Sequence, residues 1–410
     1  MVAAGAIGRL LEAQAVEQTH SRVRIRRAAR ESSSVAMTET VDRIVKGKRV
    51  LICAGSGGVG KTTTSAAIAM GLAAQGRRVV VLTIDPARRL AQSLGLEELG
   101  NEARRVEPER FAAAGVEVHG ELWAMMLDAK RTFDGLVDRY AADEAARDRL
   151  LRNRIYQEVS NAVSGSQEYM AMEKLGELEA EGRYDVLVLD TPPTRNALDF
   201  LDAPSRLAKF IDSRALGVFL RPSGRLLGRG SSLLFLAMKR ITGVDVMEDI
   251  SEFFGAFGDM AQGFRDRARR VNALLEAPET AFLLVTSPAP DAVDEALYFR
   301  QRLAERDMPF AGVVVNRMNM APGKEDAELP RTALDDLLGP ELAGKVARNL
   351  DDVRRLAARD QHSVDRLRRE LGRAPIVQVP HLEDDVHDIG GLAEMNRHLF
   401  ERGAALERSA

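Results

Sequence analysis

Residues 55–64 read GSGGVGKTTT and directly follow the apolar run VLICA. Gly55, Gly60, Lys61 and Thr62 satisfy the pattern G-x-x-x-x-G-K-[ST], which describes a phosphate-binding loop when a strand precedes it and a helix follows. Glycines let backbone N–H groups turn inward around phosphates, and the N-terminus of the next helix adds partial positive charge. The pattern therefore predicts a nucleotide site at the end of the first strand. The alternative is a glycine-rich turn without a ligand.

The loop residues have separate expected roles. Lys61 is expected to neutralise the β- and γ-phosphates of ATP, and the Thr62 hydroxyl is expected to ligate Mg²⁺. ATP and Mg²⁺ are thus the predicted cofactors. The predicted ATP-binding residues of the loop are Gly55, Gly57, Gly58, Val59, Gly60, Lys61, Thr62 and Thr63.

Two aspartates follow apolar runs and supply the acids that a nucleotide hydrolase needs. Asp190 ends VLVLD, as expected for the carboxylate that holds Mg²⁺, in part through water. Asp85 follows RVVVLTI and precedes Pro86, which suits a residue that orients the attacking water. The alternatives are a helix N-cap at Asp85 and an Asx turn at Asp190. Their joint placement at strand ends favours the catalytic interpretation.

The chain alternates short β-branched strands with helical stretches. The apolar strands are typical of a parallel sheet buried on both faces, so we predict an α/β fold with a doubly wound, mostly parallel sheet of the P-loop NTPase type. The first predicted helix covers residues 61–75. The predicted strands are residues 49–54, 78–84, 184–189, 281–286, 310–315 and 376–379.

The predicted domain organisation is one ATPase domain at 46–410, preceded by an N-terminal extension at 1–45 that has no strand pattern. Translation could begin at Met1 or at Met37. Two intervals are too long for simple crossovers, and we expect helical insertions at about 100–183 and 196–280 that pack together as a helical subdomain.

Composition limits the classes of partner. The 410 residues carry a formal charge of −3, which gives no global attraction to nucleic acid, so we expect no nucleic-acid partner. The single cysteine, Cys53, rules out an internal disulfide framework. No run of 18 apolar residues occurs, and Arg9 and Glu12 interrupt the N-terminal apolar segment, so we predict a cytoplasmic protein.

Three motifs in order resemble one family. GSGGVGKTTT, TIDPARRLAQSLG and LDTPPTRNALDFLDAP are similar to the phosphate loop, switch I and switch II of the ArsA family of dimeric ATPases, which includes arsenite-efflux ATPases and targeting ATPases for tail-anchored membrane proteins. The similarity spans about residues 46–400. The resemblance implies that Asp85 positions the attacking water, that Asn316 contacts adenine and that Pro380 lines the base pocket. Asp85 and Lys61 are the expected catalytic residues.

The chain also departs from the family pattern. Ser56 stands where the most specific relatives carry a second lysine, which reaches the partner's nucleotide across the dimer interface. Family members usually have DPAH in switch I, whereas this chain has DPAR, with Arg88 in place of the histidine and Arg89 directly after it; either arginine could substitute for that lysine. The cysteines of the arsenite and zinc sites have no counterpart. We therefore expect a dimer, preferably a heterodimer with a paralogue that retains the lysine.

The predicted function is an ATP-hydrolysing dimeric switch whose nucleotide state is coupled to a helical client surface. The alternatives are a regulatory ATP-binding subunit with little turnover, an arsenite or anion pump subunit, and a partition-type ATPase. Residues 247–264 carry an aromatic and methionine stripe that either packs as core or lines a groove for a hydrophobic or membrane-protein client.

Overall fold

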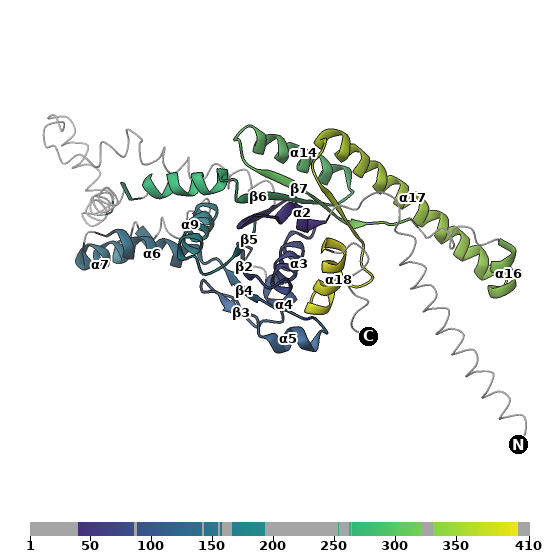
Figure 1. The fold of residues 1–410 in the computed structure, drawn as a ribbon, viewed down its shortest axis with the longest axis horizontal. Coiled ribbons are helices and arrows are strands. Elements are labelled where there is room, and N and C mark those ends of the chain that lie inside the picture. Colours follow the sequence, from purple (N-terminus) through teal and green to yellow (C-terminus); the bar gives the residue numbers. More distant parts are fainter. Residues whose placement is uncertain are drawn as a thin grey trace, which may run out of the picture.

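The structure is a computed structural model of the chain. It describes residues 40–85, 88–141, 143–154, 156–157, 166–192, 253, 262–263, 265–321 and 331–400. The described elements form a central sheet with helices on both faces, and the long helix α17 runs from its contacts with α14 and β7 out to α16, which lies away from the sheet (Figure 1).

The sheet has eight strands in the order β3-β4-β2-β5-β1-β6-β7-β8. All neighbouring pairs are parallel except β3 and β4, which are antiparallel. The six predicted strands and the doubly wound α/β fold are confirmed. The strand bounds are β1 Val50–Ala54, β2 Arg78–Thr83, β3 Arg104–Arg105, β4 Glu121–Met126, β5 Val186–Asp190, β6 Thr280–Thr286, β7 Phe310–Met318 and β8 Ile376–Pro380.

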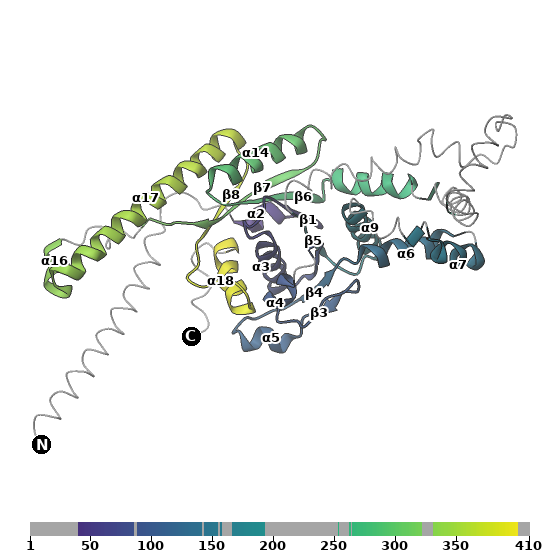
Figure 2. The same ribbon diagram turned by 180° about the vertical axis from the view of Figure 1, so that it is seen from behind.

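The helices connect these strands as crossovers. The predicted helix after the glycine-rich loop is confirmed as α3, and α18 packs beside it on the same face of the sheet (Figure 2). The helix bounds are α2 Val41–Val45, α3 Lys61–Ala74, α4 Arg89–Ser93, α5 Pro108–Ala113, α6 Ala129–Tyr140, α7 Glu144–Arg152, α9 Ser166–Glu181, α14 Pro290–Ala304, α16 Arg331–Leu338, α17 Pro340–Leu371 and α18 Ile389–Phe400.

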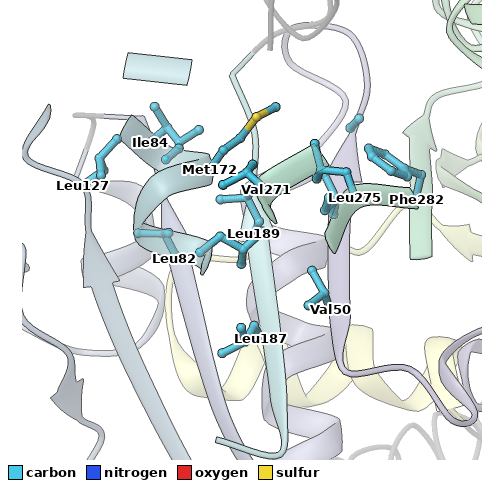
Figure 3. Packing of buried hydrophobic residues seen from close by; sticks show 14 of the residues in the cluster. Val50, Leu82, Ile84, Leu127, Met172, Leu187, Leu189, Val271, Leu275 and Phe282 are labelled. Carbon is cyan, nitrogen blue, oxygen red and sulfur yellow. The ribbon is translucent and has the colours of Figure 1, made fainter. Parts of the chain in front are cut away.

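Strand alternation divides the core into two hydrophobic clusters, one on each face. In β1, Val50 and Ile52 belong to one cluster while Leu51 and Cys53 belong to the other, as expected when successive side chains point to opposite faces. Figure 3 shows the first cluster, in which Met172 of α9 lies over the β2 and β5 side chains. Burial on both faces explains why these strands lack polar alternation.

Two expectations need correction. Residues 41–45, which the sequence pattern assigned to the extension, form α2, whose side chains Val41, Ile44 and Val45 are buried. The first long interval is not entirely helical, since it contributes β3 and β4 to the central sheet. The rest of the extension, at 1–39, lies outside the described residues.

The second insertion lies almost wholly outside the described residues. Of the stripe at 247–264, Phe253 is described, and it is buried in the same cluster as β1 and α9. Among the described residues, no helix is both long enough and apolar enough to cross a membrane. The 32-residue helix α17 is long enough to cross a membrane, but charged residues occur throughout its sequence.

Candidate nucleotide site

The glycine-rich loop joins the end of β1 to the first residue of α3, which is Lys61. Gly58 and Gly60 have φ angles of 78° and 92°, a left-handed backbone that glycine adopts without steric cost. A Cβ on Gly60 would lie 2.4 Å from Asn316 Nδ2, and one on Gly55 would lie 1.9 Å from the Val285 carbonyl oxygen. The loop conformation therefore requires glycine at Gly55 and Gly60, the two glycines that the motif specifies.

Lys61 is buried at the start of α3 and is only 7% exposed. Its Nζ donates a 2.8 Å hydrogen bond to the backbone oxygen of Ser56, inside the loop. Burial lowers the pKa of Lys61, while the negative charges of Asp190 and Asp85 act in the opposite direction. The ammonium thus lies within the loop that is predicted to bind phosphates, close to both predicted acids.

Asp190 ends β5, the strand that lies between β1 and β2 in the sheet. Its Oδ2 accepts hydrogen bonds from Thr62 Oγ1 at 2.7 Å and from Thr83 Oγ1 at 2.9 Å. Its Oδ1 is buried and has no hydrogen-bond partner among the described residues. Burial raises the pKa of Asp190 to about 6, and the two threonine hydroxyls and Lys61 lower it less than burial raises it.

The threonine hydroxyl at Thr83 was not predicted as part of the site. It bridges the two predicted acids, because it donates to Asp190 and accepts a 3.2 Å hydrogen bond from the backbone N–H of Asp85. A polar residue in the otherwise apolar run RVVVLTI is the signal that sequence reasoning could have used. Hydrogen bonds therefore connect Thr62 to Asp190, Asp190 to Thr83, and Thr83 to Asp85.

Asp85 lies two residues beyond the end of β2 and is partly buried. The first residue of the next helix, α4, is Arg89, and its N-cap is Arg88. The N-cap alternative for Asp85 is therefore not supported. The Asx-turn alternative for Asp190 is also not supported, since its Oδ2 accepts hydrogen bonds from threonine side chains on two other elements.

Asn316 lies near the end of β7 and is 8% exposed. Its Nδ2 donates a 2.9 Å hydrogen bond to the Val59 carbonyl, so it contacts the loop from the side of β7. Pro380 ends β8 and is opposite Met318 in the parallel pairing of β7 and β8. The structure thus places Asn316 against the loop. Pro380 lies on the next strand, and its role in base binding stays a prediction.

Ser56 lies in the loop with its side chain 9% exposed, and its Oγ has no hydrogen-bond partner among the described residues. Arg88 and Arg89 are both exposed, and the charge of Arg89 contributes to lowering the pKa of Lys61. Cys53 is buried in β1, and burial raises the pKa of its thiol to about 12. The thiol is therefore a buried group that stays protonated at neutral pH.

The sequence model of the anion-transporting ATPase family matches residues 48–332, which include the loop, both acids and Asn316. The chain belongs to this family. The predicted ArsA family membership and the prediction of an ATPase are confirmed. The matched region extends from just before β1 into α16, so it covers seven of the eight strands described above.

Individual ArsA-family relatives agree with this assignment. The chain is 27% identical to "ATPase GET3" of Podospora anserina over 297 residues, which covers 72% of this chain and 80% of that protein. It is 23% identical to "ATPase BagA" of Mycobacterium tuberculosis over 384 residues, covering 88% of this chain and 94% of the relative. The similarity thus extends beyond the loop to nearly the whole chain.

Proposed function

We propose that the chain is an ATP-hydrolysing dimeric switch that binds Mg²⁺ with the nucleotide. The observation that carries this proposal is the contact of Thr62 and Thr83 with Asp190 beside Lys61. A loop lysine, a hydroxyl at the start of the helix and a strand-end carboxylate are the parts that P-loop hydrolases use for phosphate and magnesium. Family membership supports hydrolysis as the reaction.

The donor set at Thr62 and Asp190 fits Mg²⁺. Mg²⁺ prefers oxygen ligands and usually takes only one or two protein ligands, with water and phosphate oxygens completing its shell. Asp190 Oδ1 is a buried oxygen without a partner among the described residues, and no group of three or more His, Cys, Asp or Glu gathers as a metal site in that part of the chain. When bound, Mg²⁺ supplies neutralisation of the phosphate charge.

The protein's own residues divide the remaining work. Lys61 leaves the Ser56 carbonyl and places its ammonium on the terminal phosphates, while backbone N–H groups of Gly57 to Thr63 hold the others. Asp85 orients the attacking water, and Asn316 and Pro380 contact the base.

The proposed Asp85 role has a direct test. Substitution of Asp85 by asparagine should leave nucleotide affinity nearly intact while turnover falls, because the side chain acts on water rather than on phosphate. Titration calorimetry and steady-state hydrolysis on the same preparation separate the two quantities. Equal turnover would remove Asp85 from the reaction.

Ser56 supports a hetero-assembly. A serine is too short and uncharged to reach a partner's nucleotide, and the Ser56 side chain is buried in its own loop. A homodimer then lacks the second cation at both sites, whereas a paralogue with the lysine completes the site built on this chain. In the competing arrangement, Arg88 or Arg89 supplies the second cation in place of the lysine. Both side chains are exposed and therefore accessible to a partner. The second candidate function is a regulatory subunit with little turnover. The serine at Ser56 favours it as well.

The proposed output is a change at a client or partner surface. In this proposal, the nucleotide state is coupled to the helical insertions. A hydrophobic or membrane-protein client binds the surface that the insertions form. The buried position of Phe253 favours a core role for that part of the 247–264 stripe. Crosslinking of an apolar probe peptide to the remaining stripe, compared between ATP and ADP, tests the client proposal. A pump for anions is the alternative, and the single cysteine gives it no thiolate set for arsenite.

A further inference from the structure

The end of β7 departs from a regular strand. Its pairing with β8 shifts register between Val315 and Met318. Within this shift Arg317 has a φ of 61°, a left-handed backbone that non-glycine residues rarely adopt. We refer to residues 315–318 as the β7 bulge.

The bulge lets two consecutive side chains contact the same loop. Asn316 Nδ2 donates to the Val59 carbonyl at 2.9 Å, and an Arg317 guanidinium nitrogen donates to the Gly58 carbonyl at 3.0 Å. In a regular strand, neighbouring side chains point to opposite faces, so both could not reach successive carbonyls of one loop. The left-handed backbone at Arg317 is thus tied to a specific pair of contacts.

A residue of α17 holds the chain directly after the bulge. Asp360 of α17 is fully buried, and its Oδ2 accepts hydrogen bonds from Asn319 N at 2.9 Å and from Asn319 Nδ2 at 2.7 Å. Its Oδ1 accepts from the guanidinium of Arg359. A satisfied buried carboxylate therefore fixes the residue that follows the bulge.

The part of the loop that Arg317 contacts has little other support. Gly57 and Gly58 are exposed, and a Cβ added to Gly58 would meet no atom within 4 Å. Packing does not hold this segment, whereas Gly55 and Gly60 on either side are in close contact with β6 and β7. The hydrogen bond from Arg317 to the Gly58 carbonyl restrains it.

We propose that Arg317 is a positioning residue for the nucleotide phosphates. Its guanidinium holds the Gly58 carbonyl on the outside of the loop, which keeps the neighbouring N–H groups turned inward toward phosphate. This inference rests on the proposed ATPase function. Because a preformed loop is needed equally by bound ATP and by the transition state, Arg317 contributes uniform binding and acts on affinity rather than on the chemical step.

The decisive variant is Arg317→Gly. Glycine adopts a φ of 61° without strain, so the bulge keeps its backbone while the guanidinium is lost. We expect Kd for Mg·ADP and KM for Mg·ATP to rise about tenfold, the scale of one hydrogen bond to a charged group, with kcat within about twofold of the wild type. Thermal melting without nucleotide should change little.

Two further variants control the interpretation. Arg317→Lys should recover part of the affinity, because an ammonium can still donate to the Gly58 carbonyl. Arg269→Ala removes an arginine of which 75% of the side chain is exposed and which pairs with Asp266, and it should behave as the wild type. The full-length protein is used throughout.

The outcomes separate this inference from the proposed function. A wild type that binds no Mg·ADP contradicts the proposed function itself. A wild type that binds, together with an Arg317→Gly protein of equal Kd, overturns the positioning role alone. A fall in kcat with KM unchanged also overturns it, since that pattern belongs to a cation that acts on developing phosphate charge.

Discussion

Thr62 and Asp190 lie 128 positions apart in the chain, yet Thr62 Oγ1 donates a 2.7 Å hydrogen bond to Asp190 Oδ2. The contact follows from topology. Thr62 follows β1 through the glycine-rich loop, Asp190 is the last residue of β5, and these two strands are parallel neighbours that end at the same edge of the sheet. The same carboxylate is fully buried. The fold thus keeps an acid in an environment that disfavours its charged form.

The first prediction concerns the pH dependence of Asp190. Its folded pKa of about 6 lies above the unfolded value of 3.8, so wild-type stability falls as pH rises between these values and stays lower above them. Asp190→Asn cannot titrate. Its stability relative to the wild type should therefore increase by about 2 kcal/mol between pH 4.5 and 7.5 in the absence of nucleotide. Urea unfolding at both pH values measures this difference. An unchanged difference would mean that Asp190 ionises normally in the folded protein.

The second prediction concerns Asp85. Asp85→Asn should reduce turnover by about 10²-fold or more, the usual scale for a positioned acid–base group, while Kd for Mg·ADP changes little. Asp128→Asn is a matched control, since Asp128 is an aspartate that caps α6. If both variants retain wild-type turnover, the carboxylate at Asp85 has no role in the reaction.

The third prediction concerns Ser56. The isolated chain should hydrolyse ATP slowly, and Ser56→Lys should raise turnover, because a cation supplied across an interface contributes ~10³–10⁵ in rate in related phosphoryl transfers. Mixing the wild-type chain with a paralogue that carries the lysine should also raise it. Brisk turnover of the isolated chain that Ser56→Lys does not increase would contradict the missing-cation argument. Loss of that activity in Arg88→Ala or Arg89→Ala would then assign the cation to switch I.

The fourth prediction concerns the N-terminus. The sequence predicts that residues 1–36 are an extension that buries little surface, so a chain that begins at Met37 should keep the melting temperature and nucleotide affinity of the full chain. A chain that begins at Lys46 loses the buried side chains of Val41, Ile44 and Val45, and its melting temperature should fall by at least about 5 °C. Differential scanning calorimetry compares the three proteins. A large loss already at Met37 would show that residues 1–36 dock on the fold.

The sequence allowed prediction of the central strands because they are buried on both faces and consist mainly of β-branched residues and leucine. β4 was missed for a physical reason. Its sequence ELWAMM contains residues of weak strand propensity, and its place in the sheet depends on parallel pairing with the distant strand β2, in which Arg78 is opposite Glu121. Pairing between distant segments cannot be read from local periodicity.

The same distinction applies to the site. The loop, Asp85 and Asp190 were predictable because motif spacing and strand ends are local features. The contact of Arg317 with Gly58 was not, since it depends on a left-handed residue inside a strand and on a buried carboxylate at Asp360 in a later helix. Thr83 is an intermediate case. The sequence shows a polar residue at the end of an apolar run, but it does not show that this hydroxyl contacts Asp190 and Asp85.

The most direct test of the proposed function is titration calorimetry of the full chain with ADP and ATP, with and without Mg²⁺. We predict binding by the wild type that strengthens with Mg²⁺ and is lost in Lys61→Ala, because Lys61 is the buried cation of the loop. Lys345→Ala removes an exposed lysine of α17 that pairs with Glu341, and it should bind as the wild type does. Wild-type protein that shows no magnesium-dependent nucleotide binding, or Lys61→Ala protein that binds equally well, would contradict the account.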